Sequence, residues 1–151
     1  MRVMGLDVGT KTVGVAVSDA LGYTAQGITV VRRTHLRADL DALAKLVESH
    51  EVTLAVIGLP LNMDGTEGPR AEASRAFAER FTARTGVPVE LWDERLSTVA
   101  AQRVLLEGDV SRAKRKQVVD QVAAAIILQG WLDARPSQAP EEPWDDEAED
   151  S

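Results

Sequence analysis

The chain contains no cysteine among its 151 residues, which excludes disulfides, thiolate zinc sites and cysteine nucleophiles. Aromatic residues make up only 4% of the sequence, so binding of single strands by a row of stacked bases is not expected. No apolar run approaches the roughly 18 residues that a membrane span requires. The first residues lead into a strand pattern and lack a signal-peptide core. We therefore expect a cytoplasmic location and no membrane partner.

The net charge of -7 comes from one end of the chain. Residues 138–151 hold seven acidic side chains and no basic one, whereas residues 1–137 hold 17 of each sign. A segment rich in Pro and Glu buries too little apolar surface to offset its ordering entropy. We therefore expect one folded domain over residues 1–136 and a disordered acidic tail over residues 137–151. The tail is either a solubilising segment or a phosphate mimic that competes with substrate.

The order of predicted elements indicates the fold class. Apolar and β-branched runs predict strands at 3–7, 12–18, 27–33, 54–58 and 87–92. Apolar spacing and capping residues predict helices at 36–49, 69–85, 97–107 and 117–133, with a polar, basic connector over 109–116. Three strands that can pair antiparallel, followed by strand–helix alternation, predict an α/β fold. Its mixed five-stranded sheet is flanked by helices on both faces.

Asp7 ends an apolar strand, where a carboxylate is costly unless it is paired or binds a cation. Its alternative role is to cap the turn through Gly9 and Thr10. Glu94 follows another strand, at the end where open α/β sheets bind ligands. If that strand lies beside the first, Glu94 meets Asp7, and a divalent cation would relieve their repulsion. The alternative for Glu94 is a solvated turn.

Asp120 lies on the last predicted helix. It shares a face with Lys116, Ala123, Ile127 and Trp131, so this face is basic on one side of Asp120 and apolar on the other. From there the carboxylate can reach the strand ends that carry the other two acidic residues. A structural role near the positive end of the helix dipole is the alternative.

Taken together, these three residues predict a metal centre. Asp7, Glu94 and Asp120 offer only oxygen ligands, which favour Mg²⁺ or Mn²⁺ over zinc. Such a site can activate a water and stabilise a leaving oxygen. It also lets an acidic cluster accept a phosphate. We therefore predict that these residues are both the catalytic groups and the metal ligands of a nuclease.

Four segments carry a resemblance to a known family: GLDVGTK at 5–11, GLPLNMDGT at 58–66, WDERLST at 92–98 and KQVVDQVAAAIILQ at 116–129. In order and spacing they closely resemble the YqgF (RuvX) family over about residues 1–135. The resemblance implies a ribonuclease H-like fold, related to the Holliday-junction resolvases. It also implies a role in maturing the 5′ end of 16S ribosomal RNA. By motif position, the family's acidic triad falls on Asp7, Glu94 and Asp120.

Seven residues are predicted to contact nucleic acid: Lys11, Asn62, Arg95, Arg112, Lys114, Arg115 and Lys116. The last four form the one dense basic cluster of the sequence and adjoin Asp120, which suits phosphate positioning. A solvated charged face is their alternative. Lys11 either meets a phosphate or is a solvated turn residue, and Arg95 either neutralises Glu94 or touches substrate. Asn62 lies in the loop after the fourth predicted strand.

Precursor ribosomal RNA and branched DNA both remain as substrates, since no residue visibly recognises a 2′-hydroxyl. Resolution of a junction would require a homodimer, whereas a monomer favours RNA. A non-catalytic nucleic-acid-binding domain is a further alternative. Residues 7–10 also resemble the first phosphate loop of the actin and sugar-kinase class of phosphotransferases. That class needs two such domains, and this chain is too short for them.

Overall fold

The structure is a computed structural model that describes residues 2–97 and 112–135. Within residues 112–135, side chains are described from residue 120 onward. Its elements, in chain order, are β1 (Arg2–Val8), β2 (Thr12–Ser18), β3 (Ala25–Arg32), α1 (Leu36–Ser49), β4 (Val52–Leu59), α2 (Pro69–Thr85), β5 (Val89–Asp93), the short 3-10 helix η1 (Glu94–Leu96) and α4 (Arg112–Ala134). No helix within these described ranges is long and apolar enough to cross a membrane.

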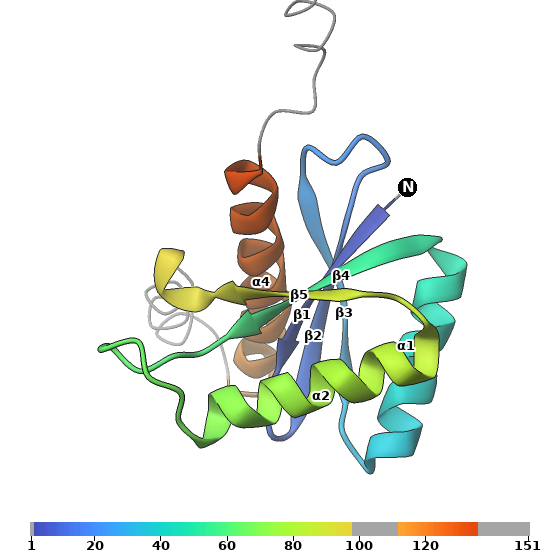
Figure 1. The fold of residues 1–151 in the computed structure, drawn as a ribbon. Coiled ribbons are helices and arrows are strands. Elements are labelled where there is room, and N and C mark those ends of the chain that lie inside the picture. Colours follow the sequence, from blue (N-terminus) through green and yellow to red (C-terminus); the bar gives the residue numbers. More distant parts are fainter. Residues whose placement is uncertain (1, 98–111, 136–151) are drawn as a thin grey trace, which may run out of the picture.

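The predicted α/β architecture is confirmed. The five strands form one mixed sheet in the order β3-β2-β1-β4-β5. The β1–β2 and β2–β3 pairs are antiparallel, whereas β1–β4 and β4–β5 are parallel. Figure 1 shows α1 and α2 on one side of this sheet and α4 on the other. The central strand β1 is therefore covered on both faces.

Strand alternation divides the core into two layers. Successive side chains of a strand point to opposite faces of the sheet. Met4 and Leu6 of β1 accordingly pack with α1 and α2, whereas Val3 packs with α4. Asp7 has the same parity as Val3, so it belongs to the face that α4 covers. Ile127 and Trp131 are buried in this second layer, which confirms the apolar face expected for the last helix.

Glycines allow α4 to lie very close to the sheet. A Cβ atom placed on Gly5 would stand 2.7 Å from Leu128 Cβ, and one on Gly14 would collide with the main-chain carbonyl of Asp120. Interior strand glycines mark such close approaches of backbone to backbone. The position of α4 over β1 and β2 therefore depends on these two missing side chains.

Several observed elements begin at other residues than expected; β4, for example, begins at Val52 instead of residue 54. The expectation of a connector over 109–116 is wrong for its last five residues, because α4 begins at Arg112. Lysine and arginine are good helix formers, so a basic run does not oppose a helix. β5 begins at Val89 instead of residue 87, since Pro88 has no N–H to donate to the ladder. β3 begins earlier, at Ala25, whose N–H is bound by the Gln129 side chain. Residues 98–107 of the third expected helix, and the acidic tail, lie outside the described residues.

Candidate active site

Asp7 lies near the end of β1, and its side chain is only 7% exposed. Its antiparallel neighbour on β2 is Gly14. On the other side, Leu6 of β1 pairs with Ile57 of β4, so the next residue along β4, Gly58, lies beside Asp7. The buried carboxylate therefore has a glycine next to it on each adjacent strand, which leaves space on the α4 face.

Glu94 reaches this space by a different route from the one considered in the sequence. The strand before it, β5, lies beside β4 and not beside β1, so the two acidic residues do not come from neighbouring strands. β1 and β5 are therefore two strand spacings apart, which amounts to about 9–10 Å. Gly58 lies in between, and a Cβ atom there would stand 2.5 Å from Glu94 Oε2 and 3.1 Å from Glu94 Cγ. The Glu94 side chain thus crosses β4 toward Asp7 where β4 has no side chain.

Asp120 approaches from α4. Its main-chain carbonyl lies directly over Gly14, the residue paired with Asp7. Its carboxylate Oδ2 accepts a short hydrogen bond from the hydroxyl of Thr12, which begins β2. Local sequence patterns did not reveal this contact, because 108 positions separate its two partners. A glycine within a strand was the available signal, since it indicates a close approach.

The residues that carry the three carboxylates therefore lie at one corner of the sheet. Asp7 lies at the centre of this corner. Asp120 lies over Gly14 on one side of Asp7, and the Glu94 side chain lies over Gly58 on the other side. Among the described residues, no three Asp, Glu, His or Cys side chains stand in an arrangement that would already hold a metal ion. The structure brings the three predicted residues to a common corner, and their closure around a cation stays a prediction.

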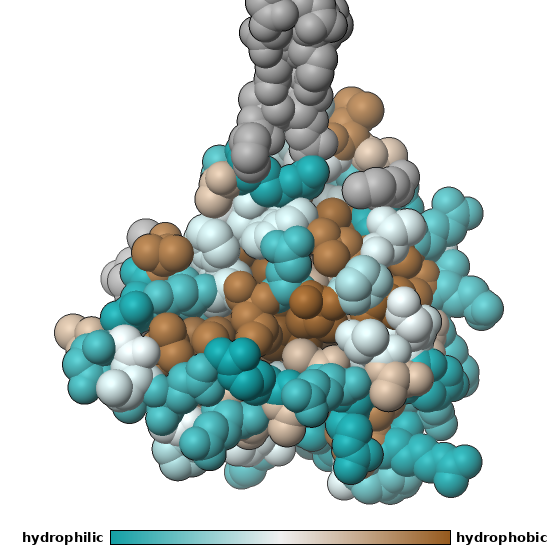
Figure 2. Space-filling view, in the orientation of Figure 1, coloured by the Kyte–Doolittle hydropathy of each residue, from teal (hydrophilic) through white to brown (hydrophobic). Residues whose placement is uncertain are grey.

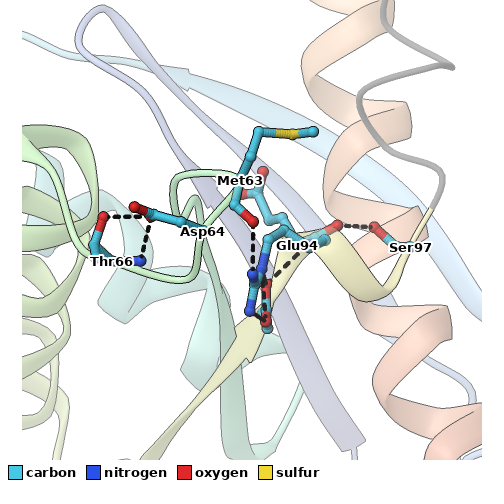
Figure 3. Close-up of polar contacts among 7 residues, drawn as sticks. Met63, Asp64, Thr66, Glu94 and Ser97 are labelled. Atoms are coloured by element: carbon cyan, nitrogen blue, oxygen red, sulfur yellow. Dashed lines mark hydrogen bonds and ion pairs between the residues drawn. The ribbon is translucent and has the colours of Figure 1, made fainter.

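Arg95 binds a neighbour other than the one considered in the sequence. Its guanidinium donates to both carboxylate oxygens of Asp93, with Nη2 2.7 Å from Oδ2. This contact lowers the pKa of Asp93 below its usual value and raises that of Arg95. Arg95 Nη1 also donates to the main-chain carbonyl of Met63, at 3.2 Å. Arg95 therefore links η1 to the loop between β4 and α2, as drawn in Figure 3.

The other predicted nucleic-acid contacts fall around the same corner. Lys11 is exposed in the turn between β1 and β2, at the end of the sheet where Asp7 lies. The Asn62 amide donates to the Thr66 hydroxyl at 2.9 Å, so it shapes the loop after β4. The four basic residues from Arg112 to Lys116 belong to the first turns of α4, and their side chains lie outside those that are described.

Sequence relatives identify the family. Residues 1–134 match the family model described as "RuvX: Holliday junction resolvase". A protein from Myxococcus xanthus is 69% identical over 150 residues, which cover 99% of each chain. One from Symbiobacterium thermophilum is 59% identical over 141 residues, or 93% of this chain and 98% of that one. Both bear the name "Putative pre-16S rRNA nuclease".

Solved structures establish the fold independently. Thermus thermophilus RuvC in complex with a Holliday junction substrate superposes with a TM-score of 0.57 at 13% identity, covering 88% of this chain and 95% of that chain. The fowlpox virus Holliday junction resolvase gives a TM-score of 0.51 at 13% identity, covering 89% of this chain and all of the other. The fold is thus ribonuclease H-like. Because the family model spans nearly all of the chain before the acidic tail, the chain belongs to the RuvX family.

Proposed function

We propose that this chain is a divalent-metal-dependent nuclease that cleaves phosphodiester bonds in the 5′ region of precursor 16S ribosomal RNA. Asp7, Glu94 and Asp120 are its catalytic carboxylates and metal ligands. The observation that carries the proposal is the row Gly14–Asp7–Gly58, whose glycines let the main chain of Asp120 and the side chain of Glu94 approach the strand that carries Asp7. The names of the relatives support the RNA substrate. The proposal includes a cytoplasmic location.

The donor set fits Mg²⁺ or Mn²⁺. Three carboxylates supply only hard oxygen ligands, which these cations prefer. The two glycines give the main chain of Asp120 and the side chain of Glu94 the space beside Asp7 that strand side chains would otherwise fill. When bound, a divalent ion lowers the pKa of a water molecule and offsets the negative charge of the phosphate. The residues present at the corner therefore suit the cation that the chemistry requires.

The residues of the chain would position the reacting groups. Asp7 is buried on the central strand, so its carboxylate is held by a rigid part of the fold. The Thr12 hydroxyl orients the carboxylate of Asp120. Lys11 is exposed on the adjoining turn and offers a positive charge to a substrate phosphate. Such positioning matters because a misplacement of about 1 Å can lower a rate by roughly 100-fold.

Cleavage assays with two substrates test the proposal. One substrate is an end-labelled RNA that spans the 5′ leader and the mature start of 16S RNA, and the other is a four-way DNA junction. Both are incubated with the same preparation in Mg²⁺, in Mn²⁺ and in EDTA. We expect metal-dependent cleavage of the RNA. Cleavage of neither substrate in either metal would overturn the proposal, and RNA binding without cleavage would favour the non-catalytic alternative.

A matched pair of variants on α4 controls this assay. Asp120→Asn removes one proposed ligand, whereas Asp133→Asn makes the same change about 20 Å farther along the helix, at an exposed residue. We expect the first variant to be inactive and the second to cut like the parent. Equal activity in both would remove Asp120 from the catalytic group.

Branched DNA is the second candidate substrate, favoured by the description of the family model. A four-way junction has two equivalent strands to cut, so its resolution calls for a symmetric dimer. Measurement of the molar mass in solution, with and without a junction, bears directly on this alternative. A dimer that cuts the junction and leaves the RNA intact would replace the RNA proposal.

A further inference from the structure

Two exposed apolar side chains flank the proposed site. Among the described residues, the large hydrophobic side chains left exposed are Leu21, Tyr23, Met63 and Leu96, at 73%, 62%, 94% and 66%. Leu21 and Tyr23 lie in the β2–β3 loop, at the opposite end of the sheet from Asp7. Met63 and Leu96 lie in the two segments that follow the carboxyl ends of β4 and β5, beside Glu94. Single exposed hydrophobic side chains are common on protein surfaces, so the informative feature of Met63 and Leu96 is that both lie in segments close to the proposed site.

The loop that carries Met63 is closed by hydrogen bonds. Two of these bonds join main-chain groups: the Gly65 N–H donates to the Asn62 carbonyl at 2.8 Å, and the Asn62 N–H donates to the Thr66 carbonyl at 2.9 Å. The Asp64 carboxylate accepts from the Thr66 amide and hydroxyl at 3.0 and 2.6 Å. Figure 3 shows the Met63 side chain leaving the loop on the side away from these contacts. An apolar side chain is therefore presented to solvent by a turn whose main chain is held in place.

Arg95 fixes the two apolar residues relative to one another. It precedes Leu96 in η1, and its guanidinium donates to the Met63 carbonyl while it is paired with Asp93. Figure 2 shows hydrophobic surface over η1 and paler brown at the tip of the loop after β4. Arg95 thus connects the loop that carries Met63 to the segment that carries Glu94 and Leu96.

We propose that Met63 and Leu96 contact the faces of unstacked nucleobases next to the scissile phosphate, so that the site takes a single-stranded or flexible segment in preference to continuous duplex. This inference rests on the proposed nuclease function. Carboxylates and basic residues account for the phosphates, but base faces are apolar and need an apolar partner. Methionine and leucine serve as such wedges between base steps in other nucleic-acid-binding proteins. Because the chain has few aromatic residues, aliphatic side chains make this contact with the base faces.

Fluorescence of 2-aminopurine tests the contact directly. Short RNAs that carry this base at successive positions are titrated with the full chain, in EDTA to keep the RNA intact, as single strands and as perfect duplexes. We expect the parent to increase the fluorescence at one or two adjacent positions of the single strand and to leave the duplex unchanged. The double variant Met63→Ala/Leu96→Ala should lose this increase and bind the single strand about tenfold more weakly, the effect of losing well-buried aliphatic contacts.

Two controls keep the result specific. Leu21→Ala makes the same kind of change at the far end of the sheet, and Met63→Leu keeps an apolar side chain at the tip, so both should retain the fluorescence increase. An unchanged signal and affinity in the double variant would overturn the inference, as would an equal loss in Leu21→Ala. A changed molar mass with unchanged RNA affinity would instead assign the two residues to contact with a second copy.

The inference and the proposed function fail in different ways. Absence of cleavage by the parent, with the 2-aminopurine signal intact, would overturn the nuclease proposal and leave the base contact standing. Parental cleavage with the same signal in the double variant would overturn the base contact alone.

Discussion

Replacement of Gly58 by alanine places a methyl group where Glu94 crosses β4. The new Cβ atom would lie 2.5 Å from Glu94 Oε2 and 2.6 Å from Ile127 Cδ1. Apolar carbon atoms pack at about 3.5–4.0 Å, so each neighbour must move by roughly 1 Å. Ile127 is fully buried and has little room to move, whereas the end of the Glu94 side chain can swing aside. We expect the carboxylate to leave the corner it shares with Asp7.

The cost to stability should be modest. Overpacking of a core typically costs about 1–3 kcal/mol. Against this, replacement of glycine by alanine recovers about 0.4–1 kcal/mol by restricting the unfolded chain. The net loss at Gly58 is therefore about 1–2 kcal/mol, which lowers the Tm of a chain of this size by a few degrees. Displacement of Glu94 by about 1 Å, in contrast, should lower cleavage by roughly 100-fold.

Gly86→Ala is the matched control. Gly86 ends α2 with a φ of 77°, and a Cβ atom there would meet nothing within 4 Å. Alanine in this left-handed conformation costs about 1–2 kcal/mol and leaves the corner untouched. Thermal unfolding and cleavage rates are measured on both variants. A Gly58→Ala protein that cuts as fast as Gly86→Ala would refute the role given to this close approach.

Two further substitutions test the surroundings of the corner, and a third tests a buried ion pair in the first turn of α1. Thr12→Val removes the hydroxyl that binds Asp120, and a hydrogen bond to a charged group is worth about 1.5–3 kcal/mol. We expect kcat to fall at least about tenfold in steady-state cleavage. Thr12→Ser keeps the hydroxyl and should have a kcat close to that of the parent. Asp39 is 1% exposed and accepts from Arg33 Nε at 3.1 Å, so Asp39→Asn should lower the free energy of unfolding in urea by about 2 kcal/mol. Gly14→Ala would drive a Cβ atom into a main-chain carbonyl of α4 that cannot swing aside, so its thermal unfolding should reveal a loss of roughly 3 kcal/mol, at the upper end of overpacking effects.

Local signals were sufficient to predict most of the fold. The bounds predicted for α1 agree with the structure because its apolar spacing extends over the whole helix, and those for α2 agree because its ends carry explicit start and stop residues. Pro69 opens α2, and Gly86 ends it in the left-handed conformation. Strand order, however, depends on which surfaces pack together. The placement of β5 beside β4 instead of β1 follows from such contacts between distant segments, which no single segment encodes.

The sequence indicated candidate residues for the site, whereas the way the fold brings them to one corner could not be predicted. Asp7 and Glu94 stood out because charged residues at the ends of apolar strands require an explanation. The glycines that bring them together are ordinary residues in the strand pattern, and their function becomes visible only when α4 and Glu94 occupy the space above them. Arg95 was predicted either to neutralise Glu94 or to touch substrate, but its pairing with Asp93 and with the Met63 carbonyl depends on the fold of the loop.

Binding of Mn²⁺ is the most direct test of the central claim, that carboxylates from β1, η1 and α4 share one cation. The measurement is a titration of the protein with Mn²⁺, in which the paramagnetic resonance signal of the free ion reports the bound fraction. We predict that the parent and Asp133→Asn bind alike, and that Asp7→Asn and Asp120→Asn each raise the Kd about tenfold or more while remaining folded, because each removes a charged oxygen ligand. An unchanged Kd in either of these two variants would contradict the account.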